Sequence, residues 1–552
     1  MVSGRRGYRP GPASQAQVAF AAARGILSRV PSDRAPTLRL LAAAGTGALL
    51  AASFLPHGVP ALGWLAVAPL WVAARESPGW RAALRLGLVA GVVMGAIGYP
   101  WIIDLLHTFG ELDLWLCVPL FVVFALWTAA PLAAWAAMVS AWTGPSRHVP
   151  WVLSMVLSGL WWSWPMLFPF TLAMGLAARP EWIQAAELGG VALVEVPMML
   201  CGVLLGEAWR ARGPARLRFG VIALVLPLVS LALGRWRIDS LAGETTRTVR
   251  VGLVQPNIPL LWFDRPAKLE RLREPSARAE AEGAELVVWP ENMFPWTLNR
   301  PFERDFSDDD RVLRRHSLPT LFGAGTAADS DPYGYNSVIN MAADGRVVGR
   351  YDKIYLVPLG EEIPLVDPEW AKGLVPGMAH NFRGAGPGRL VVQPGPAGSE
   401  APPIAFGPLV CYEDVLPAFA REVAAQPGGI EAFVNLTNDT WFGPTAEPWQ
   451  HLALSQFRAV EHRIPVLRAV NSGPSSLVDR AGRVVATTDL RAVSIDAPVP
   501  PEHLVVPLEL GRDTASAPTV YARGGWLFGH VCQASVLVVL ALLWRRRRPA
   551  SA

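Results

Sequence analysis

The sequence predicts a bundle of membrane-spanning helices with one α/β domain inserted near its C-terminal end. Three observations lead to this fold class. Of the 552 residues, 52% are hydrophobic and only 17% are charged, which is too apolar for a wholly soluble chain of this length. Apolar runs of membrane length fill residues 37–235 and return at 526–544. Between 245 and 510 the apolar runs shrink to the length of strands and turn signals become frequent.

Roughly 20 apolar residues cross the hydrocarbon core of a bilayer. By this measure, seven runs in the first half of the chain are candidate spans, and an eighth follows the inserted domain. The eight expected spans are 38–56, 60–74, 86–106, 114–140, 150–171, 188–208, 218–234 and 526–544.

The distribution of charge predicts the orientation of these spans. Arginines concentrate in the tail 1–36, in alternate loops and in the final segment 545–552, whereas the other loops hold mainly acids and histidines. By the positive-inside rule, both tails are cytoplasmic and the domain 245–510 is periplasmic. The net charge is only +4, and the basic residues sit in clusters beside apolar runs, so we expect no nucleic-acid partner. No cleavable signal peptide is evident at the N-terminus.

Glu195 lies well within the sixth expected span. An ionisable group at that depth is energetically costly and usually faces a partner or a cavity. We expect a structural partner inside the bundle rather than a substrate contact.

The inserted domain alternates strand-length and helix-length segments. Asp344-Gly345 is a hairpin signal, and 479–482 begins a second hairpin. The pattern predicts a mixed sheet covered by helices and fits two sheets packed back to back, a choice that periodicity alone does not decide. The expected strands are 248–254, 285–290, 319–325, 335–341, 346–351, 390–394, 404–411, 431–436 and 466–471, and the expected helices are 266–282, 308–316, 415–425 and 446–462.

Three residues in this domain could perform nucleophilic catalysis. The cysteines at 117, 201, 411 and 532 share no close spacing, which argues against a disulfide framework or a zinc knuckle, and only Cys411 lies in the inserted domain. Cys411 ends an apolar strand, Glu291 follows the rigid pair Trp289-Pro290, and Lys353 ends a hairpin strand. We interpret Cys411 as a nucleophile, Glu291 as its general base and Lys353 as the cation that stabilises an oxyanion. Each residue alone has a simpler explanation, because a lone cysteine is often a small hydrophobe and Glu and Lys are often solvated.

At these three positions the sequence resembles a known family. Trp289-Pro-Glu291, Tyr351-Asp-Lys353-Ile-Tyr-Leu-Val-Pro-Leu-Gly-Glu361 and Cys411-Tyr-Glu413 resemble the Glu-Lys-Cys signatures of the nitrilase superfamily. Their detailed forms, inside eight expected spans, resemble its membrane-embedded branch, the apolipoprotein N-acyltransferases, over roughly residues 37–545. Further downstream, the segment Asn438–Gly443 and the residues Gln450, His451, Arg458, Glu461 and Arg468 also match that family's pattern.

The resemblance implies an αββα sandwich inserted between helices seven and eight, and it implies that Glu291, Lys353 and Cys411 are catalytic. It further implies that Glu361, Tyr412 and Glu413 support the site. Trp262 is either a substrate contact or an aromatic residue of the core or the membrane surface. No metal or organic cofactor is implied.

The reaction implied by the resemblance is an acyl transfer at the bacterial inner membrane. An acyl chain would pass from a phospholipid, expected to be phosphatidylethanolamine, through a thioester on Cys411 to the α-amine of a diacylglyceryl-cysteine at the N-terminus of an apolipoprotein. We expect a monomer.

Two alternatives remain: a membrane-anchored amidase or nitrilase that uses the same triad, and a transporter with an inactive outer domain. The sequence departs from the family at Tyr355, where His is common, and at Leu359, where Phe is common, which puts the local packing of the substrate in doubt.

Overall fold

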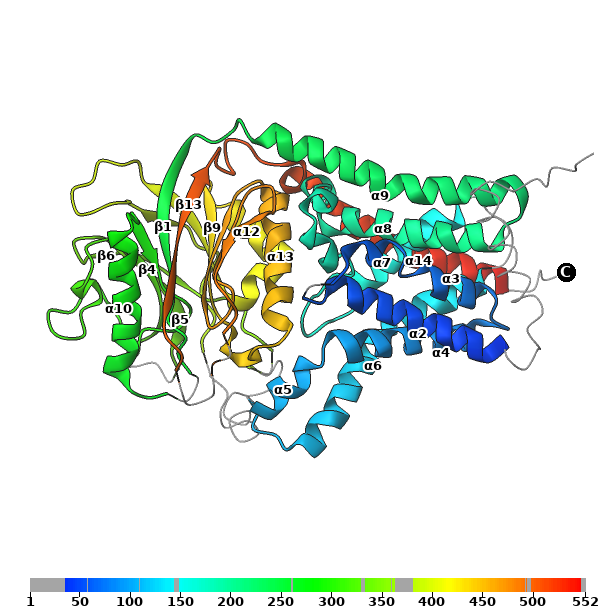
Figure 1. Cartoon of the computed structure of the whole chain (residues 1–552), viewed down its shortest axis with the longest axis horizontal. Coiled ribbons are helices and arrows are strands. Elements are labelled where there is room, and N and C mark those ends of the chain that lie inside the picture. Colours follow the sequence, from blue (N-terminus) through cyan, green and yellow to red (C-terminus); the bar gives the residue numbers. More distant parts are fainter. Residues whose placement is uncertain are drawn as a thin grey trace, which may run out of the picture.

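The computed structural model of the chain describes residues 35–547 except 57, 109, 143–147, 260–261, 329–332, 359, 363–380, 492 and 494–497. Within these residues the chain forms a helical bundle and a β-rich domain that lie side by side (Figure 1). The expected tail 1–36 falls almost wholly outside the described residues, as does most of 545–552.

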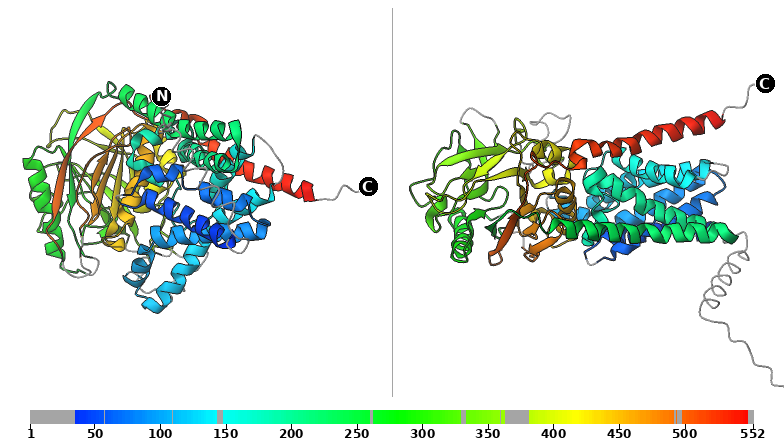
Figure 2. Two further views of the ribbon diagram at one scale, coloured as in Figure 1. Left: turned by 45° about the vertical axis from the view of Figure 1, so that its right-hand side comes forward. Right: turned by 90° about the horizontal axis from the view of Figure 1, so that it is seen from above.

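Helices of the bundle precede and follow the β-rich domain in the sequence. The last helix leaves the domain through a π-helical turn, Tyr521–Gly525, and runs along the bundle (Figure 2). The bundle consists of α2 (Ala35–Phe54), α3 (Ala68–Arg75), α4 (Trp80–Gly98), α5 (Trp101–Thr108), α6 (Leu114–Ala141), α7 (Val149–Ser163), α8 (Ala186–Arg210), α9 (Gly213–Leu241) and α14 (Leu527–Arg547), with short 3₁₀ turns η1 (Pro60–Trp64), η2 (Met174–Ala178) and η3 (Pro180–Ile183).

Small residues allow close helix packing in the bundle. A Cβ atom added to Gly87 would lie 2.5 Å from Cα of Ala133, and one added to Gly91 would lie 2.4 Å from Cα of Ala129. Glycine therefore lets α4 and α6 approach until their backbones touch, as is common where helices pack within a bilayer.

Six helices within the described residues are long and apolar enough to cross a membrane, namely α2, α4, α6, α8, α9 and the segment Tyr521–Arg546 around α14. The apolar helix α7 is shorter. The expected span 60–74 instead forms η1 and the eight-residue α3, whose length of about 12 Å cannot cross a core of about 30 Å. The run 86–106 divides into α4 and α5 at Pro100, which interrupts a helix. The expected count of eight spans is therefore not confirmed.

The β-rich domain contains two mixed sheets among the described residues. The seven-stranded sheet has the order β13-β1-β2-β4-β5-β6, with β3 beside β4, and the six-stranded sheet has the order β12-β11-β10-β9-β8-β7. The first consists of β1 (Arg247–Gln255), β2 (Leu286–Val288), β3 (Leu298–Asn299), β4 (Thr320–Ala327), β5 (Tyr335–Met341), β6 (Val347–Asp352) and β13 (Glu502–Leu510). The second consists of β7 (Leu390–Val392), β8 (Ile404–Val410), β9 (Ala432–Asn438), β10 (Val466–Asn471), β11 (Ser476–Val478) and β12 (Val484–Thr487).

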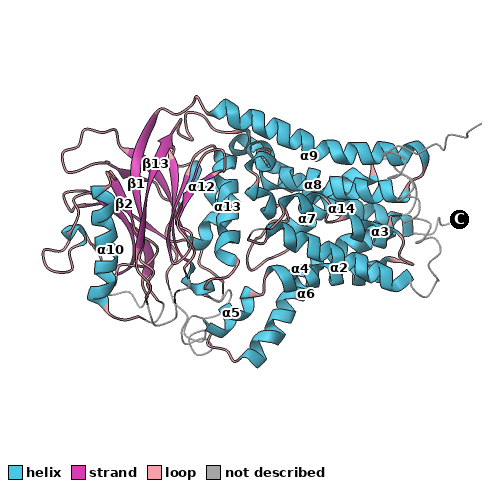
Figure 3. Ribbon diagram, in the orientation of Figure 1, coloured by secondary structure: helices cyan, strands magenta, loops and turns pink. Residues whose placement is uncertain are grey.

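The two sheets pack face to face between helices. Buried Val251 and Val288 of one sheet share an apolar cluster with Phe406 and Val434 of the other. Helix α10 (Arg265–Ala281) covers the outer face of the first sheet, and α12 (Pro417–Ala424) and α13 (Glu447–His462) cover the second (Figure 3). The arrangement that periodicity left open is thus a four-layered αββα sandwich.

Some sequence expectations for this domain were incomplete or wrong. Strand β13 is absent from the expected strands. Its Pro507 is tolerated because β13 is an edge strand, and its partner β1 lies far away in the sequence. The helix expected at 308–316 is only a turn, Val312–Arg314. The carboxylate of Asp305 accepts hydrogen bonds from the backbone N–H groups of Phe306 (2.9 Å), Val312 (2.8 Å) and Leu313 (2.9 Å), and this holds the segment as a loop.

Helix α13 joins the β-rich domain to the bundle. It lies between the second sheet and the bundle helices, and nearly all of its residues are buried (Figure 1). Gln450 Nε2 donates to Gly98 O at the end of α4 (2.9 Å), Gln456 Nε2 donates to Ala177 O in η2 (3.0 Å), and Arg463 just beyond the helix pairs with Glu187 of α8 at 2.7 Å. These buried polar contacts fix the domain on the bundle.

Glu195 binds partners inside the bundle, as expected. Its carboxylate accepts hydrogen bonds from Ser158 Oγ (2.6 Å), Trp162 Nε1 (3.2 Å), the backbone N–H of Leu172 (3.1 Å) and the hydroxyl of Thr171. Leu172 and Thr171 belong to the loop between α7 and η2. Glu195 therefore ties this loop to α7 and α8.

Candidate active site

Three elements that end at the same edge of the domain carry the predicted catalytic residues. Glu291 lies three residues beyond β2, Lys353 directly follows β6, and Cys411 directly follows β8. Strand β2 is parallel to its neighbours β1 and β4, and β8 is parallel to β9. The carboxyl ends of parallel strands in an α/β fold form the usual place for a binding site.

Glu291, Lys353 and Glu361 form a buried ionic group. Lys353 Nζ lies 3.1 Å from Glu291 Oε1 and 2.7 Å from Glu361 Oε2, and the lysine side chain is only 1% exposed. The backbone N–H of Asn438 donates to Glu291 Oε2 at 3.1 Å, and that of Val357 donates to Glu361 Oε2 at 2.9 Å. A lysine is buried to this degree only when it is paired, and the two carboxylates provide that pairing.

The electrostatics keep Lys353 charged and Cys411 protonated at rest. Burial alone lowers the pKa of Lys353, but Glu291, Glu361 and Cys411 outweigh it and hold that pKa well above its ordinary value. Burial and the charge of Glu291 raise the pKa of the Cys411 thiol, and Lys353 opposes them only in part. Burial also raises the pKa of Glu291, despite its contact with Lys353. The thiol therefore needs a base to become a thiolate.

Cys411 begins a tight turn with an unusual backbone conformation. Its φ of 48° lies in the left-handed region, and it opens the 3₁₀ turn η5 (Cys411–Val415). Few non-glycine residues adopt this conformation, and those that do cluster at functional sites. Asn435 Nδ2 on β9 donates to the Cys411 carbonyl at 3.1 Å. The surrounding strands thus hold the thiol in a fixed, partly exposed position.

Glu413 holds this turn from inside the protein. Its Oε1 accepts hydrogen bonds from Tyr351 Oη (2.7 Å) and from the backbone N–H groups of Ile354 (2.7 Å) and Tyr355 (3.1 Å). Its Oε2 accepts from the backbone N–H of Val410 at 2.8 Å. Burial raises the pKa of Glu413 to about 7. One fully buried carboxyl therefore joins the segment after Lys353 to the turn that carries Cys411.

The three predicted catalytic residues line one cavity, of about 140 Å³. Apart from Glu361, its remaining wall is apolar and comes partly from the bundle. Ile102, Leu105 and Leu106 belong to α5, and Leu167 and Phe168 belong to the loop that Glu195 holds. The cavity thus joins polar catalytic groups of the domain to an apolar wall of the bundle.

Of the other predicted site residues, one lines the same cavity as Cys411, one lines a neighbouring pocket and one lines neither. Glu361 lines the cavity beside Lys353. Tyr412 lines a second, smaller pocket next to Cys411, and its hydroxyl donates to Leu167 O at 3.2 Å. Trp262 lines neither, and its ring lies 5.6 Å from the Arg271 guanidinium of α10.

Of the two departures from the family pattern, Tyr355 packs its ring on Phe419 of α12 at 4.9 Å, outside the cavity lining. Leu359 lies outside the described residues.

Comparison with known proteins places these features in a family. The carbon-nitrogen hydrolase family matches residues 250–497, and the apolipoprotein N-acyltransferase N-terminal domain matches residues 46–204. An apolipoprotein N-acyltransferase of Geobacter metallireducens is 32% identical over 94% of this chain and 98% of its own length. The chain belongs to the apolipoprotein N-acyltransferase family. It is therefore an acyltransferase and a multi-pass membrane protein with a nitrilase-like domain.

The chain is also similar to other proteins. An apolipoprotein N-acyltransferase of Gloeobacter violaceus is 31% identical over 81% of this chain and 85% of its own length. Among solved structures, Nit3 of Saccharomyces cerevisiae, of the nitrilase superfamily, is 18% identical and covers 49% of this chain and 92% of its own, with a TM-score of 0.35.

Asn336 is a site residue of this acyltransferase that sequence reasoning missed. Its Nδ2 donates to Glu291 Oε1 at 2.7 Å and to Glu361 Oε1 at 3.3 Å, so it bridges the two carboxylates that pair with Lys353. The register of the hairpin formed by β5 and β6 could have indicated Asn336 from the sequence. Ser337 pairs with Asp352, which places Asn336 opposite Lys353, and the backbone N–H of Lys353 donates to Asn336 O at 2.8 Å.

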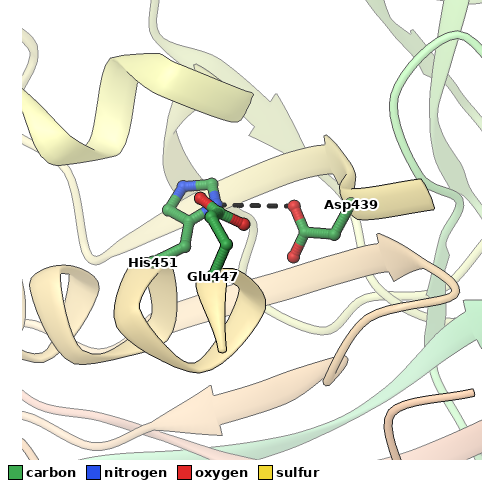
Figure 4. A group of neighbouring side chains, drawn as sticks. All are labelled: Asp439, Glu447 and His451. Carbon is green, nitrogen blue, oxygen red and sulfur yellow. Dashed lines mark ion pairs between the residues drawn. The ribbon is translucent and has the colours of Figure 1, made fainter. Parts of the chain in front are cut away.

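A second buried polar cluster of the acyltransferase lies near Cys411 and includes His451 and Asp439 (Figure 4). His451 Nε2 lies 2.7 Å from Asp414 Oδ1, and its Nδ1 lies 3.4 Å from Asp439 Oδ1. Arg468 pairs with Asp414 and lies 3.9 Å from Asp439. Burial and Arg468 lower the pKa of His451, but Asp414 and Asp439 outweigh them and raise it to about 10. Sequence reasoning noted His451 and Arg468 only as a match to the family; the structure adds their partner Asp414, next to Glu413.

Asp439, Glu447 and His451 have the residue types and spacing of a possible metal site, with one ligand atom of each within 4.8 Å of the others. The charged side chains around these three residues argue against a bound metal ion. Arg468 and a protonated His451 already neutralise Asp414 and Asp439, and a bound cation would lie close to the Arg468 guanidinium. The cluster is therefore charge-balanced by protein groups when Glu447 is neutral.

Proposed function

We propose that this enzyme transfers a fatty acyl chain from a phospholipid to the α-amino group of a diacylglyceryl-cysteine at the N-terminus of apolipoproteins, the last step of lipoprotein maturation. Phosphatidylethanolamine is the proposed donor, and the acyl chain passes through a thioester on Cys411. The family to which the chain belongs supports this reaction class.

One observation carries the proposal. The cavity that holds Glu291, Lys353 and Cys411 is walled by α5 and by the loop after α7, both of the membrane bundle. An enzyme that acts on small soluble amides has no need of such a wall. An apolar wall contributed by the bundle suits an acyl chain that arrives from the bilayer, because exposing each methylene to water instead would cost about 0.8 kcal/mol.

The first half-reaction follows from the protonation states. Glu291 takes the proton from the Cys411 thiol, whose raised pKa keeps it protonated until substrate is bound. The thiolate attacks the ester carbonyl of the phospholipid, and the Lys353 ammonium stabilises the tetrahedral oxyanion. The C–O bond then breaks, and Glu291 returns its proton to the leaving alkoxide of the lysophospholipid.

In the second half-reaction the acceptor amine attacks the thioester, an amide forms and Cys411 leaves as a thiol. A thioester suits this sequence because it forms from an ester and readily acylates an amine. In this scheme Glu361 keeps Lys353 in place, Glu413 and Tyr412 position the turn at Cys411, and Trp262 contacts substrate.

The proposed topology follows from the distribution of charge. Both termini are cytoplasmic and the domain 245–510 is periplasmic, inserted before the last span of a bundle in a bacterial inner membrane. The remaining parts of the chain are the tail 1–36, the bundle 37–235, the helix 526–544 and the basic end 545–552. The functional unit is a monomer.

The test uses the purified full-length protein in detergent micelles with acyl-labelled phosphatidylethanolamine and a synthetic diacylglyceryl-cysteinyl peptide that has a free α-amine. We expect the label to appear on the peptide as an amide, with lysophosphatidylethanolamine released in equal amount. A matched peptide with an acetylated α-amine should accept no label. Hydrolysis of small amides without transfer to the peptide would contradict the proposal and would favour the alternative, a membrane-anchored carbon-nitrogen hydrolase.

A further inference from the structure

The inference concerns a second pocket of the domain, which the proposed reaction has left without a role. Its volume is about 250 Å³, which is larger than the cavity of about 140 Å³ at Cys411. It is lined by Lys268 of α10, by the loop 292–297 that follows β2, by Ile258 and by Gly325 of β4. The pocket and the cavity share no lining residue, so they are separate sites.

The chain and the sheet register place this pocket next to the catalytic group. Asn292 directly follows Glu291 in the sequence. Gly325 on β4 is the cross-strand partner of Asn336 on β5, and Asn336 donates to Glu291 Oε1 at 2.7 Å. Adjacent strands lie about 4.7–4.9 Å apart, so the pocket begins one strand spacing from Asn336. Because an extended residue spans about 3.3 Å, a polypeptide attached to a substrate at Cys411 needs only a few residues to reach the pocket.

Lys268 is a half-buried cation without an acidic partner. Among the described residues it forms no ion pair. The acid one turn before it, Asp264, accepts a hydrogen bond from the backbone N–H of Ala267 at 3.0 Å instead. Burial, and then the charge of Arg265, lower the pKa of Lys268. A carboxylate that enters the pocket would offset both of these effects.

Two further polar groups face the pocket beside Gly325. A Cβ atom added to Gly325 would lie 3.7 Å from Asn292 Oδ1 and 3.7 Å from Thr297 Oγ1. Asn292 and Thr297 are both exposed, so the pocket is open to solvent. The missing side chain of Gly325 leaves room beside an amide and a hydroxyl, and Lys268 adds an ammonium to the same pocket. All three groups can donate hydrogen bonds to a ligand.

The pocket belongs wholly to the domain. Its described lining includes no residue of the bundle, whereas α5 and the loop after α7 wall the cavity at Cys411. Helix α10 covers the face of the domain that points away from the bundle (Figure 1). In the proposed reaction, the acyl chains of both substrates lie toward the bundle. The polypeptide of the acceptor is the part that extends away from it.

We propose that this pocket binds the polypeptide that follows the N-terminal cysteine of the acceptor, and that Lys268 pairs there with an acidic side chain. The inference rests on the proposed function, because it assigns a binding site to the second substrate of that reaction. A carboxylate balances the charge of Lys268, while Asn292 and Thr297 can donate to carbonyl groups of the polypeptide. Lys268 therefore selects among acceptors by the charge of their first residues after the cysteine.

The experiment measures KM for three acceptors with the full-length protein in micelles and labelled phosphatidylethanolamine as donor. Each acceptor carries the same diacylglyceryl-cysteine with a free α-amine. The first has glutamates among the residues that follow the cysteine, and the second has lysines in their place. The third is the amide of diacylglyceryl-cysteine, without any polypeptide. Thioester formation is measured separately, as hydroxylamine-releasable label on Cys411 before an acceptor is added.

The variants change the charge or the space of the pocket. Lys268→Glu reverses the charge, and Lys268→Met removes it where the reversal lowers the melting temperature. Gly325→Ala adds a methyl group that meets Asn292 and Thr297 only at ordinary contact distance. The matched control is Arg278→Glu, the same reversal of charge at an exposed position of α10 that does not line the pocket.

We expect the wild type to have a lower KM for the glutamate acceptor than for the lysine acceptor. In Lys268→Glu the KM for the glutamate acceptor should rise about three- to tenfold, because a partly exposed ion pair is lost and a like-charge contact replaces it. The lysine acceptor should then be the better of the two. Gly325→Ala should raise KM for both polypeptide acceptors, and Arg278→Glu should keep the wild-type order.

Three results would overturn the inference. The first is the wild-type order of the two polypeptide acceptors in Lys268→Glu, or equal KM values for them in the wild type. The second is an equal rise in KM for the acceptor without polypeptide. The third is slower thioester formation in Lys268→Glu, which would assign the pocket to the headgroup of the donor. Absence of transfer from the wild type to any acceptor would instead contradict the proposed function.

Discussion

Replacing Glu413 by glutamine tests whether this residue holds the nucleophile in place without touching substrate. In the wild type, Oε1 accepts three hydrogen bonds and Oε2 accepts one, from the backbone N–H of Val410. A glutamine can satisfy the first three donors with its oxygen. Its amide NH₂ then faces the N–H of Val410, so two donors meet where an acceptor is required.

The expected loss of rate follows from the one hydrogen bond that Val410 loses in the Glu413→Gln variant. A hydrogen bond to a charged acceptor contributes about 1.5–3 kcal/mol, and a factor of ten in an equilibrium corresponds to about 1.4 kcal/mol. If the turn at Cys411 must be formed for attack, Glu413→Gln should slow thioester formation about 10- to 100-fold. Because burial raises the pKa of Glu413 to about 7, the rates are compared at pH 8, where its carboxylate predominates.

The assay is the burst of lysophospholipid released when enzyme is mixed with excess phosphatidylethanolamine. Glu422→Gln, a change of the same chemistry on the exposed side of α12, should leave the burst unchanged. A Glu413→Gln protein with the wild-type burst rate and the wild-type melting temperature would refute the reasoning.

Three further changes probe the rest of the account. Lys353→Met removes the oxyanion cation and should lower kcat about 10²- to 10³-fold in the transfer assay. Glu195→Ala leaves four buried donors without an acceptor and should lower the free energy of unfolding by about 2–4 kcal/mol, measured by thermal melting in micelles. His451, with a folded pKa of about 10 and an unfolded pKa of about 6.5, should stabilise the protein fully below pH 6.5 and lose that contribution as pH rises toward 10, so the melting temperature should fall over this window and fall less in His451→Gln.

Each of these has an outcome that contradicts it. Transfer by Lys353→Met at the wild-type rate would exclude the lysine from oxyanion stabilisation. Glu207→Gln is the control for Glu195, because Glu207 also lies on α8 but accepts from Trp71 (2.8 Å) and Arg210 (3.0 Å) and lines neither the cavity nor the smaller pocket at Cys411. Equal melting temperatures for Glu195→Ala and wild type would contradict the role of Glu195 in the loop. A melting temperature that is flat from pH 6.5 to 10 in the wild type would contradict the charged state of His451.

Local signals in the sequence predicted much of the domain. The Asp344-Gly345 turn located β5 at Tyr335–Met341, as in the structure, because a hairpin is determined by its turn and by alternation on either side. Strand ends likewise placed Glu291, Lys353 and Cys411 at one edge. Contacts between distant segments could not be predicted in this way. The pairing of β13 with β1, the bridge from Asn336 to two carboxylates and the entry of α5 into the cavity wall depend on tertiary packing.

In the helical bundle, composition alone gives a wrong prediction of the membrane spans. Hydropathy cannot separate a span from a short buried apolar segment, so 60–74 was counted as a span although Pro60 and Pro69 lie at the start of its two short helices. Lys268 gave no sequence signal at all, because the rest of its pocket comes from the loop after β2 and from β4, which only the fold brings next to α10.

The most direct measurement is the mass of the peptide that contains Cys411 after incubation of the protein with phosphatidylethanolamine of known acyl composition. The account predicts that this peptide gains the mass of one acyl chain, that hydroxylamine removes it, and that Cys411→Ala protein gains nothing. An acyl group that forms on another residue, or that persists in Cys411→Ala, would contradict the central claim.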